Sequence, residues 1–183
     1  MKTILFFGNS LTAGYGVGQQ NAFPALIQKL ITEASFQYQI VNAGVSGETS
    51  AGGKYRIHNW VKKPMDVFVL ELGANDGLRG IPARETSQNL QEIIDVVKKH
   101  HPETKIVLAG MEIPDIFPGR YAAEFRVIFR ELALKNNITF IPFLLEGVVG
   151  VPHLNLPDHV HPNTEGHKMI AKHVWPFLKE VLE

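Results

Sequence analysis

Brief, continuous apolar runs that alternate with helical segments are the feature of this sequence that most constrains its fold. The clearest runs are residues 4–7, 67–70, 106–108 and 138–141, and residues 39–43 form a weaker fifth. Unbroken apolar runs of this length are typical of strands buried on both faces, because a strand with one solvated face alternates apolar and polar residues. The runs therefore predict the strands of an interior parallel sheet.

Apolar residues at helical spacing fill the intervals between these runs. Such stripes predict four helices, with Asn21 as the N-cap of the first. Their apolar positions are Phe23, Leu26, Ile27, Leu30 and Ile31; Leu90, Ile93, Ile94 and Val97; Phe125, Ile128, Phe129 and Leu132; and Ile170, Val174, Phe177 and Val181. Alternation of strands and helices predicts a parallel sheet covered on both faces, with ligands bound at the carboxyl ends of the strands. Residues of a functional site are therefore expected in the loops that follow the strands.

The size and composition of the chain narrow the classes of protein to which it can belong. Its 183 residues suit one domain, 1–183, and 45% hydrophobic against 20% charged residues is typical of a globular protein. The absence of cysteine excludes disulfide scaffolds, zinc sites built on thiolates and cysteine nucleophiles. Because the formal net charge is +0, the charge balance gives no indication of a nucleic acid or an anionic membrane as partner.

The amino-terminal segment bears on where the protein works. The apolar run at residues 4–7 is shorter than the roughly 7–15 residues of a signal-peptide core, and no run reaches the roughly 20 residues that span a bilayer. We therefore expect no stable insertion into a membrane, and a cytoplasmic location for the chain as it stands. A periplasmic or secreted location applies if a signal peptide has been removed, and a homo-oligomer is left open.

Residues suited to acyl transfer follow the apolar runs at residues 4–7, 39–43 and 67–70. Ser10, in GNSLTAG, is interpreted either as the cap of a short helix or as an exposed nucleophile. Gly44, in NAGVSGETS, is either an ordinary turn residue or a backbone N–H donor to an oxyanion. Asn75, in GANDG, is either part of a turn or a second oxyanion donor through its side-chain amide.

Asp158 and His161, in DHVHP, supply the groups that could activate a hydroxyl. They are three residues apart, close enough for the carboxylate to hold one ring nitrogen while the other acts as a general base. The alternatives are a turn that leads into a helix, or a metal site formed by Asp158, His159 and His161. No other loop evidently completes the ligand shell of a metal, so no metal is expected.

Together these four blocks resemble the GDSL/SGNH hydrolase family, which is named for the Ser, Gly, Asn and His of its blocks. The resemblance covers residues 3 to about 180. LELGANDGLRG and IPFLLEGV are similar to the bacterial arylesterase/thioesterase branch, which includes the multifunctional thioesterase–protease–lysophospholipase. The resemblance implies a flavodoxin-like, three-layer α/β/α sandwich with about five parallel strands and helices on both faces, and no metal or organic cofactor.

The resemblance also implies a role for each block. Ser10 would be the nucleophile, His161 the general base and then acid, and Asp158 the partner of His161. The oxyanion hole would be formed by the backbone N–H groups of Ser10 and Gly44 and by the side chain of Asn75.

One position departs from the family pattern. Asn9 stands where the first block normally reads Gly-Asp-Ser-Leu. Asn has nearly the shape of Asp but loses the charge and gains two donors. We expect Asn9 to perturb the support of the loop without abolishing catalysis, and Asn9→Asp to restore or raise turnover.

These observations predict a serine esterase that forms an acyl-enzyme on a small-molecule ester. The expected substrates are short-chain acyl or aryl esters. Thioesters and lysophospholipids are further candidates. The alternatives are a carbohydrate O-deacetylase of the same family and a non-catalytic, flavodoxin-like binding module. The apolar residues expected to bind the acyl or aryl group are Leu78, Ile81, Met111, Ile113, Ile116 and Leu156.

Overall fold

A parallel five-stranded sheet forms the centre of the structure, a computed structural model that describes residues 1–114 and 119–183. The strand order is β2-β1-β3-β4-β5, and every pairing is parallel. The strands are β1 (Lys2–Gly8), β2 (Tyr38–Gly44), β3 (Val67–Glu71), β4 (Lys105–Ala109) and β5 (Thr139–Ile141). All five predicted strands are therefore confirmed, with small differences at their ends.

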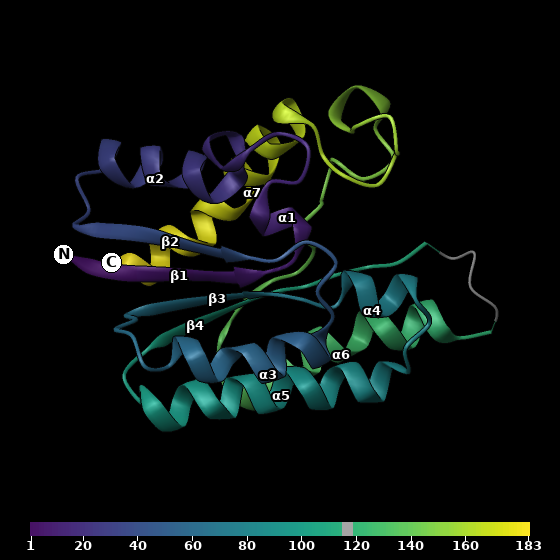
Figure 1. The fold of residues 1–183 in the computed structure, drawn as a ribbon, viewed down its shortest axis with the longest axis horizontal. Helices are drawn as coiled ribbons and strands as arrows, with labels where there is room; N and C mark the ends of the chain where they lie inside the picture. The colour runs from purple at the N-terminus through teal and green to yellow at the C-terminus, as the bar shows by residue number, and fades with distance from the viewer. Residues whose placement is uncertain (115–118) are drawn as a thin grey trace.

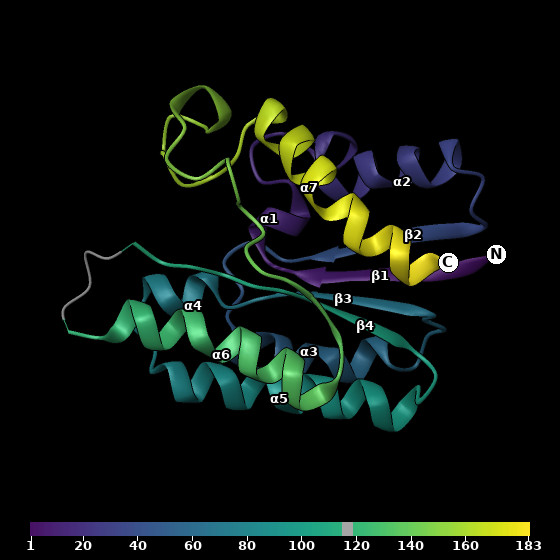
Figure 2. The same ribbon diagram turned by 180° about the vertical axis from the view of Figure 1, so that it is seen from behind.

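Helices cover both faces of the sheet, which confirms the three-layer α/β/α sandwich with the flavodoxin-like strand order. Figures 1 and 2 show α1, α2 and α7 on one face and α3, α4, α5 and α6 on the other. The helices are α1 (Ser10–Ala13), α2 (Phe23–Glu33), α3 (Ser50–Trp60), α4 (Ala74–Leu78), α5 (Ala83–His100), α6 (Tyr121–Asn136) and α7 (Thr164–Leu182), with the short 3-10 helices η1 (Gln19–Asn21) and η2 (Pro152–Leu154).

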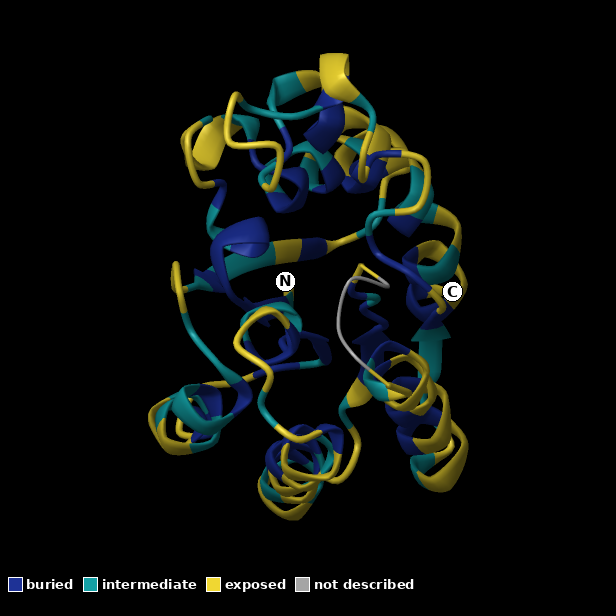
Figure 3. Cartoon of the chain, turned by 90° about the vertical axis from the view of Figure 1, so that its right-hand side faces the viewer, coloured by how far each residue is buried: buried dark blue, intermediate teal, exposed yellow. Residues whose placement is uncertain are grey.

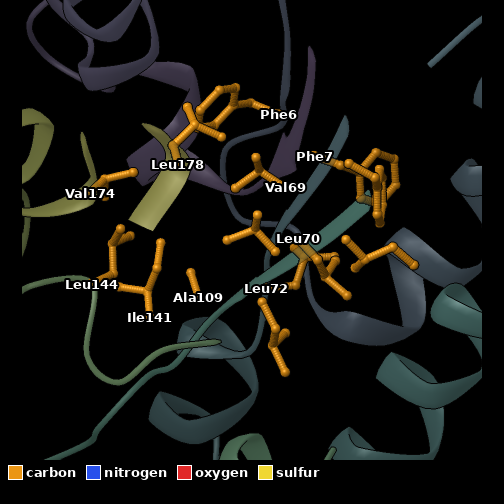
Figure 4. Close-up of a cluster of buried hydrophobic side chains, with 14 of the residues drawn as sticks. Phe6, Phe7, Val69, Leu70, Leu72, Ala109, Ile141, Leu144, Val174 and Leu178 are labelled. Carbon is orange, nitrogen blue, oxygen red and sulfur yellow. The ribbon is translucent and has the colours of Figure 1, made fainter. Parts of the chain in front are cut away.

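Burial on both faces of β1 explains why its apolar run is unbroken. Successive side chains of a strand point to opposite faces, so Phe6 and Phe7 enter different halves of the core. Phe6 packs edge to face on Phe23 of α2, with ring centroids 5.6 Å apart. Phe7 lies 5.7 Å from the ring of Phe68, and Figure 4 shows Phe6 and Phe7 pointing apart, with Leu178 on the side of Phe6.

The prediction that Asn21 caps α2 is wrong. Asn21 is the last residue of η1, and its side-chain amide donates to the carbonyl of Val17 at 3.0 Å. Helix α2 begins at Phe23 and has Pro24 in its first turn. Proline fits there because it needs no N–H partner at the start of a helix.

Helix α3 has no counterpart among the predicted helices. Gly52 and Gly53 lie in its first turn, and glycine is a poor helix former, so the sequence shows no helical stripe there. The structure gives a packing reason for Gly53, because a Cβ at this position would lie 2.3 Å from the Leu72 side chain. The glycine therefore allows α3 to approach the sheet beside the loop that follows β3.

Candidate active site

The carboxyl ends of β1, β2 and β3 meet at one edge of the sheet. Gly8 pairs with Gly44 of β2 and with Glu71 of β3, so the loops that follow these residues start side by side. Figure 3 looks onto this edge, where exposed loops surround a buried centre. The structure thus brings together the loops that carry Ser10, Gly44 and Asn75, as the strand order requires.

Ser10 is the first residue of α1 and does not cap it. The cap is Asn9, whose Oδ1 accepts a hydrogen bond from the Leu11 N–H at 3.0 Å. The interpretation of Ser10 as a helix cap is therefore wrong. Its hydroxyl makes a different contact, with Oγ 3.0 Å from Nε2 of His161.

His161 lies between Ser10 and Asp158. Its Nδ1 is 2.7 Å from Oδ2 of Asp158, while Oδ1 of Asp158 accepts the backbone N–H groups of His161 at 3.0 Å and Val160 at 2.9 Å. The backbone bonds from His161 and Val160, followed by the bond to the ring, lower the pKa of Asp158 to about 2. Asp158 is therefore ionised at neutral pH and can hold the ring with its proton on Nδ1, which leaves Nε2 as an acceptor.

The turn that carries Asp158 and His161 is closed by its own backbone. The Leu156 N–H donates to the His161 carbonyl at 2.7 Å, and the His159 N–H donates to the Leu156 carbonyl at 2.9 Å. The side chains of His161 and Asp158 are 23% and 39% exposed. Short-range bonds within one exposed turn therefore set the geometry between the carboxylate and the imidazole.

The expected oxyanion donors are only partly available in this arrangement. The Gly44 N–H donates to Oδ1 of Asn42 at 2.9 Å, a contact that the sequence did not predict. Nδ2 of Asn75 donates to the Glu48 carbonyl at 3.0 Å, which uses one of its two N–H bonds. Ser10 begins a helix, where the first N–H groups have no partner within the helix.

Tyr15 belongs to this site and was missed by sequence reasoning. Its ring centroid lies 4.4 Å from that of His161, with the planes tilted by 40°. Tyr15 is also 51% exposed, so it covers one face of the imidazole and still meets solvent. The available signal was an aromatic residue directly after the GNSLTAG block.

Asp76 was also missed, and it ties α4, which follows β3, to the start of α3. Its buried carboxylate accepts hydrogen bonds from the Ser50 N–H at 2.9 Å, from the Ser50 hydroxyl and from the Thr86 hydroxyl at 3.3 Å. Nδ2 of Asn89 donates in turn to Ser50 Oγ at 3.1 Å. Asn75 lies in α4 and not in the turn that the sequence indicated, and because Asp76 directly follows it, this network fixes the short helix that presents the Asn75 amide.

Burial divides the six apolar residues expected to bind substrate. Those that reach solvent are Leu78, Ile81 and Leu156. Met111 and Ile113 are only 2% and 5% exposed and pack within the hydrophobic core, which does not fit a surface that contacts substrate. Ile116 lies outside the described residues.

The described part of the chain was searched for metal sites and membrane spans. Within residues 1–114 and 119–183, no three or more His, Cys, Asp or Glu side chains are grouped so that they could hold a metal ion. The metal interpretation of Asp158, His159 and His161 therefore gains no support. Over these same residues, no helix combines the length and the apolarity needed to cross a membrane.

The sequence of this chain is similar to those of known proteins. A family model described as the GDSL-like Lipase/Acylhydrolase family matches residues 6–169. Esterase TesA of Pseudomonas aeruginosa is 35% identical over 183 residues, which cover 99% of this chain and 90% of the relative. Thioesterase 1/protease 1/lysophospholipase L1 of Escherichia coli K12 is 35% identical over 170 residues, 92% of this chain and 79% of the relative.

The fold of this chain is also similar to that of a solved esterase structure. The crystal structure of the psychrotrophic esterase EstA from Pseudoalteromonas sp., inhibited by monoethylphosphonate, matches with a TM-score of 0.92 at 28% identity and covers 100% of this chain and 99% of that one. The chain therefore belongs to the GDSL-like lipase/acylhydrolase family, and it is an enzyme of the ester hydrolase class.

Proposed function

We propose that this protein is a serine esterase in which Ser10, His161 and Asp158 form the catalytic triad. The observation that carries the proposal is one continuous chain of polar contacts, with Ser10 Oγ 3.0 Å from His161 Nε2 and His161 Nδ1 2.7 Å from Asp158 Oδ2. A serine hydroxyl is a weak nucleophile by itself and needs an adjacent base. Here the base is also oriented by a third group, which is the arrangement that acyl transfer to serine requires.

The reaction follows from these contacts. His161 Nε2 takes the Ser10 proton while Oγ forms a bond to the acyl carbon, and the carbonyl electron pair moves onto its oxygen. When this intermediate collapses, the bond to the leaving group breaks and His161 returns the proton to it. A water molecule then gives a proton to His161 and adds to the acyl carbon, and Ser10 Oγ leaves with that proton. One ester and one water thus become one acid and one alcohol.

The negative charge on the carbonyl oxygen would be met by the N–H groups of Ser10 and Gly44 and by the Asn75 amide. Asn75 offers the N–H that its bond to Glu48 does not use. The Gly44 N–H would share or exchange its bond to Asn42 as the charge develops. Such donors act mainly on kcat, because they meet a charge that exists only in the transition state and the intermediate.

Exposed apolar side chains on segments that follow the strands support a substrate with an apolar acyl or aryl group. Tyr15, Val45, Leu78 and Val160 are between 42% and 51% exposed, and each follows a different strand. Single exposed apolar residues are ordinary, but several at one edge favour a binding surface. The names of the relatives extend the candidates from short-chain acyl and aryl esters to thioesters and lysophospholipids.

A fluorophosphonate probe tests the nucleophile, because it reacts with an activated serine. Peptide mapping by mass spectrometry should place the label on Ser10, and Ser10→Ala should lose the label and at least roughly 10⁴ in kcat. Ser46→Ala removes an exposed serine in the loop after β2 and serves as the matched control, which should behave as wild type. A label on another serine, or near-normal turnover by Ser10→Ala, would contradict the proposal.

A substrate panel then defines the class of ester. It comprises p-nitrophenyl esters of increasing chain length, an acyl-CoA thioester, a lysophospholipid and an acetylated sugar. We expect the highest kcat/KM on an ester with an apolar acyl or aryl group. A preference for the acetylated sugar would instead favour an O-deacetylase, and a flavin spectrum of the purified protein would favour a binding module.

A further inference from the structure

A buried carboxyl group lies next to the turn that carries Ser10. Glu71 ends β3, pairs with Gly8 in the sheet and is only 1% exposed. Burial of an ionisable group is unfavourable unless hydrogen bonds compensate for the lost water. The contacts of Glu71 should therefore show what it does in an otherwise apolar strand.

The hydrogen bonds to Glu71 come from residues on either side of Ser10. Oε2 accepts the Asn9 N–H at 3.1 Å, the Thr12 N–H at 3.3 Å and the Thr12 hydroxyl at 2.7 Å. Gly8 makes room for this arrangement, because a Cβ there would lie 2.4 Å from a Glu71 carboxylate oxygen. One carboxylate oxygen thus holds both ends of the turn that presents the Ser10 hydroxyl.

Two buried polar atoms in the same place have no hydrogen-bond partner. Within the described residues they are Oε1 of Glu71 and Nδ2 of Asn9, and no other buried side-chain nitrogen or oxygen is left in this state. Buried polar atoms are normally paired, so an unpaired acceptor and an unpaired donor on neighbouring side chains need a reason. The other amide atom of Asn9, Oδ1, is already used to cap α1.

The electrostatics of Glu71 agree with this placement. Burial raises the pKa of Glu71 to about 7, and the hydrogen bonds from the Thr12 hydroxyl and from the backbone N–H groups of Asn9 and Thr12, together with the nearby Asn9 side-chain amide, oppose the rise. Arg56 is a cation near this turn, with Nη2 3.5 Å from the Gly8 carbonyl, but its guanidinium is paired with Glu48. The Asn9 side-chain amide, and not the Arg56 guanidinium, is therefore the group that acts on the Glu71 carboxyl.

We infer that Glu71 and Asn9 form a pair that positions the Ser10 turn by holding one buried negative charge, whichever of the two positions carries it. At about pH 8, where Glu71 is mostly ionised, Glu71 carries the charge in this chain beside the Asn9 amide. With Asp at position 9, as in the Gly-Asp-Ser-Leu block, two adjacent carboxyls would hold the same charge and share one proton, because both cannot ionise so close together. Glu71 acts through the turn and is a positioning residue, and this inference rests on the proposed role of Ser10 as nucleophile.

Moving the charge within the pair tests the positioning role. Glu71→Gln keeps the shape but removes the charge, and kcat on a p-nitrophenyl ester should fall about 10–100-fold with KM within about twofold. Asn9→Asp/Glu71→Gln places the charge at position 9 and should restore kcat to within about threefold of wild type. Glu103→Gln removes an exposed carboxylate just before β4, at the opposite end of the strands, and is the matched control.

Whether carboxyls at positions 9 and 71 share one proton can be tested without an activity assay. At about pH 8, Asn9→Asp should leave the electrophoretic mobility of the native protein unchanged, because the added carboxyl takes up a proton with Glu71. Asn59→Asp adds a carboxylate at an exposed position of α3 and should shift the mobility by one negative charge. This measurement also keeps the inference testable if Glu71→Gln does not fold.

Three results would each overturn the inference. They are wild-type kcat in Glu71→Gln, a double variant as slow as Glu71→Gln, and a mobility shift in Asn9→Asp equal to that in Asn59→Asp. Failure of the proposed function gives a different pattern. In that case Ser10→Ala stays active, whatever the mobility of Asn9→Asp.

Discussion

The two halves of the candidate site are held in place in different ways. The Ser10 turn is buried and tied to β3 through Glu71, so its geometry depends on the central sheet. The turn with Asp158 and His161 is partly exposed and is closed by hydrogen bonds among its own residues. Changes in the first half should therefore affect catalysis and folding together, whereas changes in the second half should affect mainly catalysis.

Asp158→Ala should separate the effect on catalysis from the effect on stability more than any other substitution. Without the carboxylate, His161 loses its orientation and its preferred tautomer, and kcat should fall roughly 10⁴-fold. The free energy of unfolding should fall by at most about 1 kcal/mol, because the hydrogen bonds that Asp158 loses lie in an exposed turn where water can replace them. Ester kinetics and urea unfolding measure the two effects, with the exposed Asp95→Ala on α5 as control. A large loss of stability would contradict the difference between the two halves, because it would mean that the core depends on this turn.

Asn75→Ala examines the oxyanion site on the side of the Ser10 turn. Loss of one donor should lower kcat about 10²–10³-fold, while KM changes little. Some loss of stability should accompany it, because the partly buried bond to the Glu48 carbonyl disappears. The measurements are steady-state kinetics and thermal unfolding, with Asn59→Ala as control. Unchanged kcat would remove Asn75 from the oxyanion hole.

Thr12→Val should show the coupled behaviour expected of the buried half. The substitution keeps the shape but removes the hydroxyl that donates to Glu71 at 2.7 Å. We expect the free energy of unfolding to fall by about 1–3 kcal/mol and kcat to fall about tenfold, because the buried carboxylate loses a donor and the Ser10 turn loosens. Urea unfolding and kinetics on the same preparation test this, and a loss of only one of the two properties would contradict the coupling.

Acid should act on catalysis and on stability through different histidines. His161 Nε2 must be unprotonated to accept the Ser10 proton, so activity should be lost in acid. His167 is buried, and its Nδ1 accepts the Phe23 N–H at 3.1 Å. Burial, with a smaller contribution from His161, lowers the pKa of His167 from 6.5 to about 4.

The sign of the stability effect follows from this pKa. Between pH 6.5 and about 4 the unfolded chain binds a proton at His167 and the folded chain does not, so stability decreases toward acid. The slope is about 1.4 kcal/mol per pH unit for this one group. Glu71, whose pKa is raised, acts in the opposite direction. The slope is therefore measured as the difference between wild type and His167→Gln, with the exposed His153→Gln as control, and equal slopes would show that His167 does not titrate in this way.

Much of the fold could be predicted because two-sided burial leaves a clear mark on a sequence. The runs at β1 and β3 are apolar in almost every position, and the stripes of α5 and α7 follow helical spacing. Helix α3 could not be found in this way, since Gly52 and Gly53 are poor helix formers and the close packing that requires glycine at position 53 is visible only in the structure. The start of α2 was misplaced because Asn21, two residues before Phe23, is of a residue type that commonly caps helices.

The candidate site could be predicted where its residues form short local patterns. Ser10, Asn75 and the Asp158–His161 pair each stand in a recognisable turn. Glu71 could not be identified, because a glutamate at the end of an apolar run is most simply a residue that returns to solvent. Only the pairing of β3 with Gly8 shows that it is enclosed. The bond of the Gly44 N–H to Asn42 is also a property of the folded loop that no residue pattern reveals.

The self-closed turn around His161 has a consequence for proteolysis. The segment before it contains Val149 and Gly150, which are exposed, and Gly150 adopts a positive φ of 74°. Exposed, irregular backbone is where proteases cut folded proteins. A cleavage there leaves Asp158 and His161 on the same fragment, still joined through Leu156 and still anchored by α7. A nicked enzyme should thus keep its acid–base pair intact, and its survival would depend on how firmly the two fragments remain associated through the core.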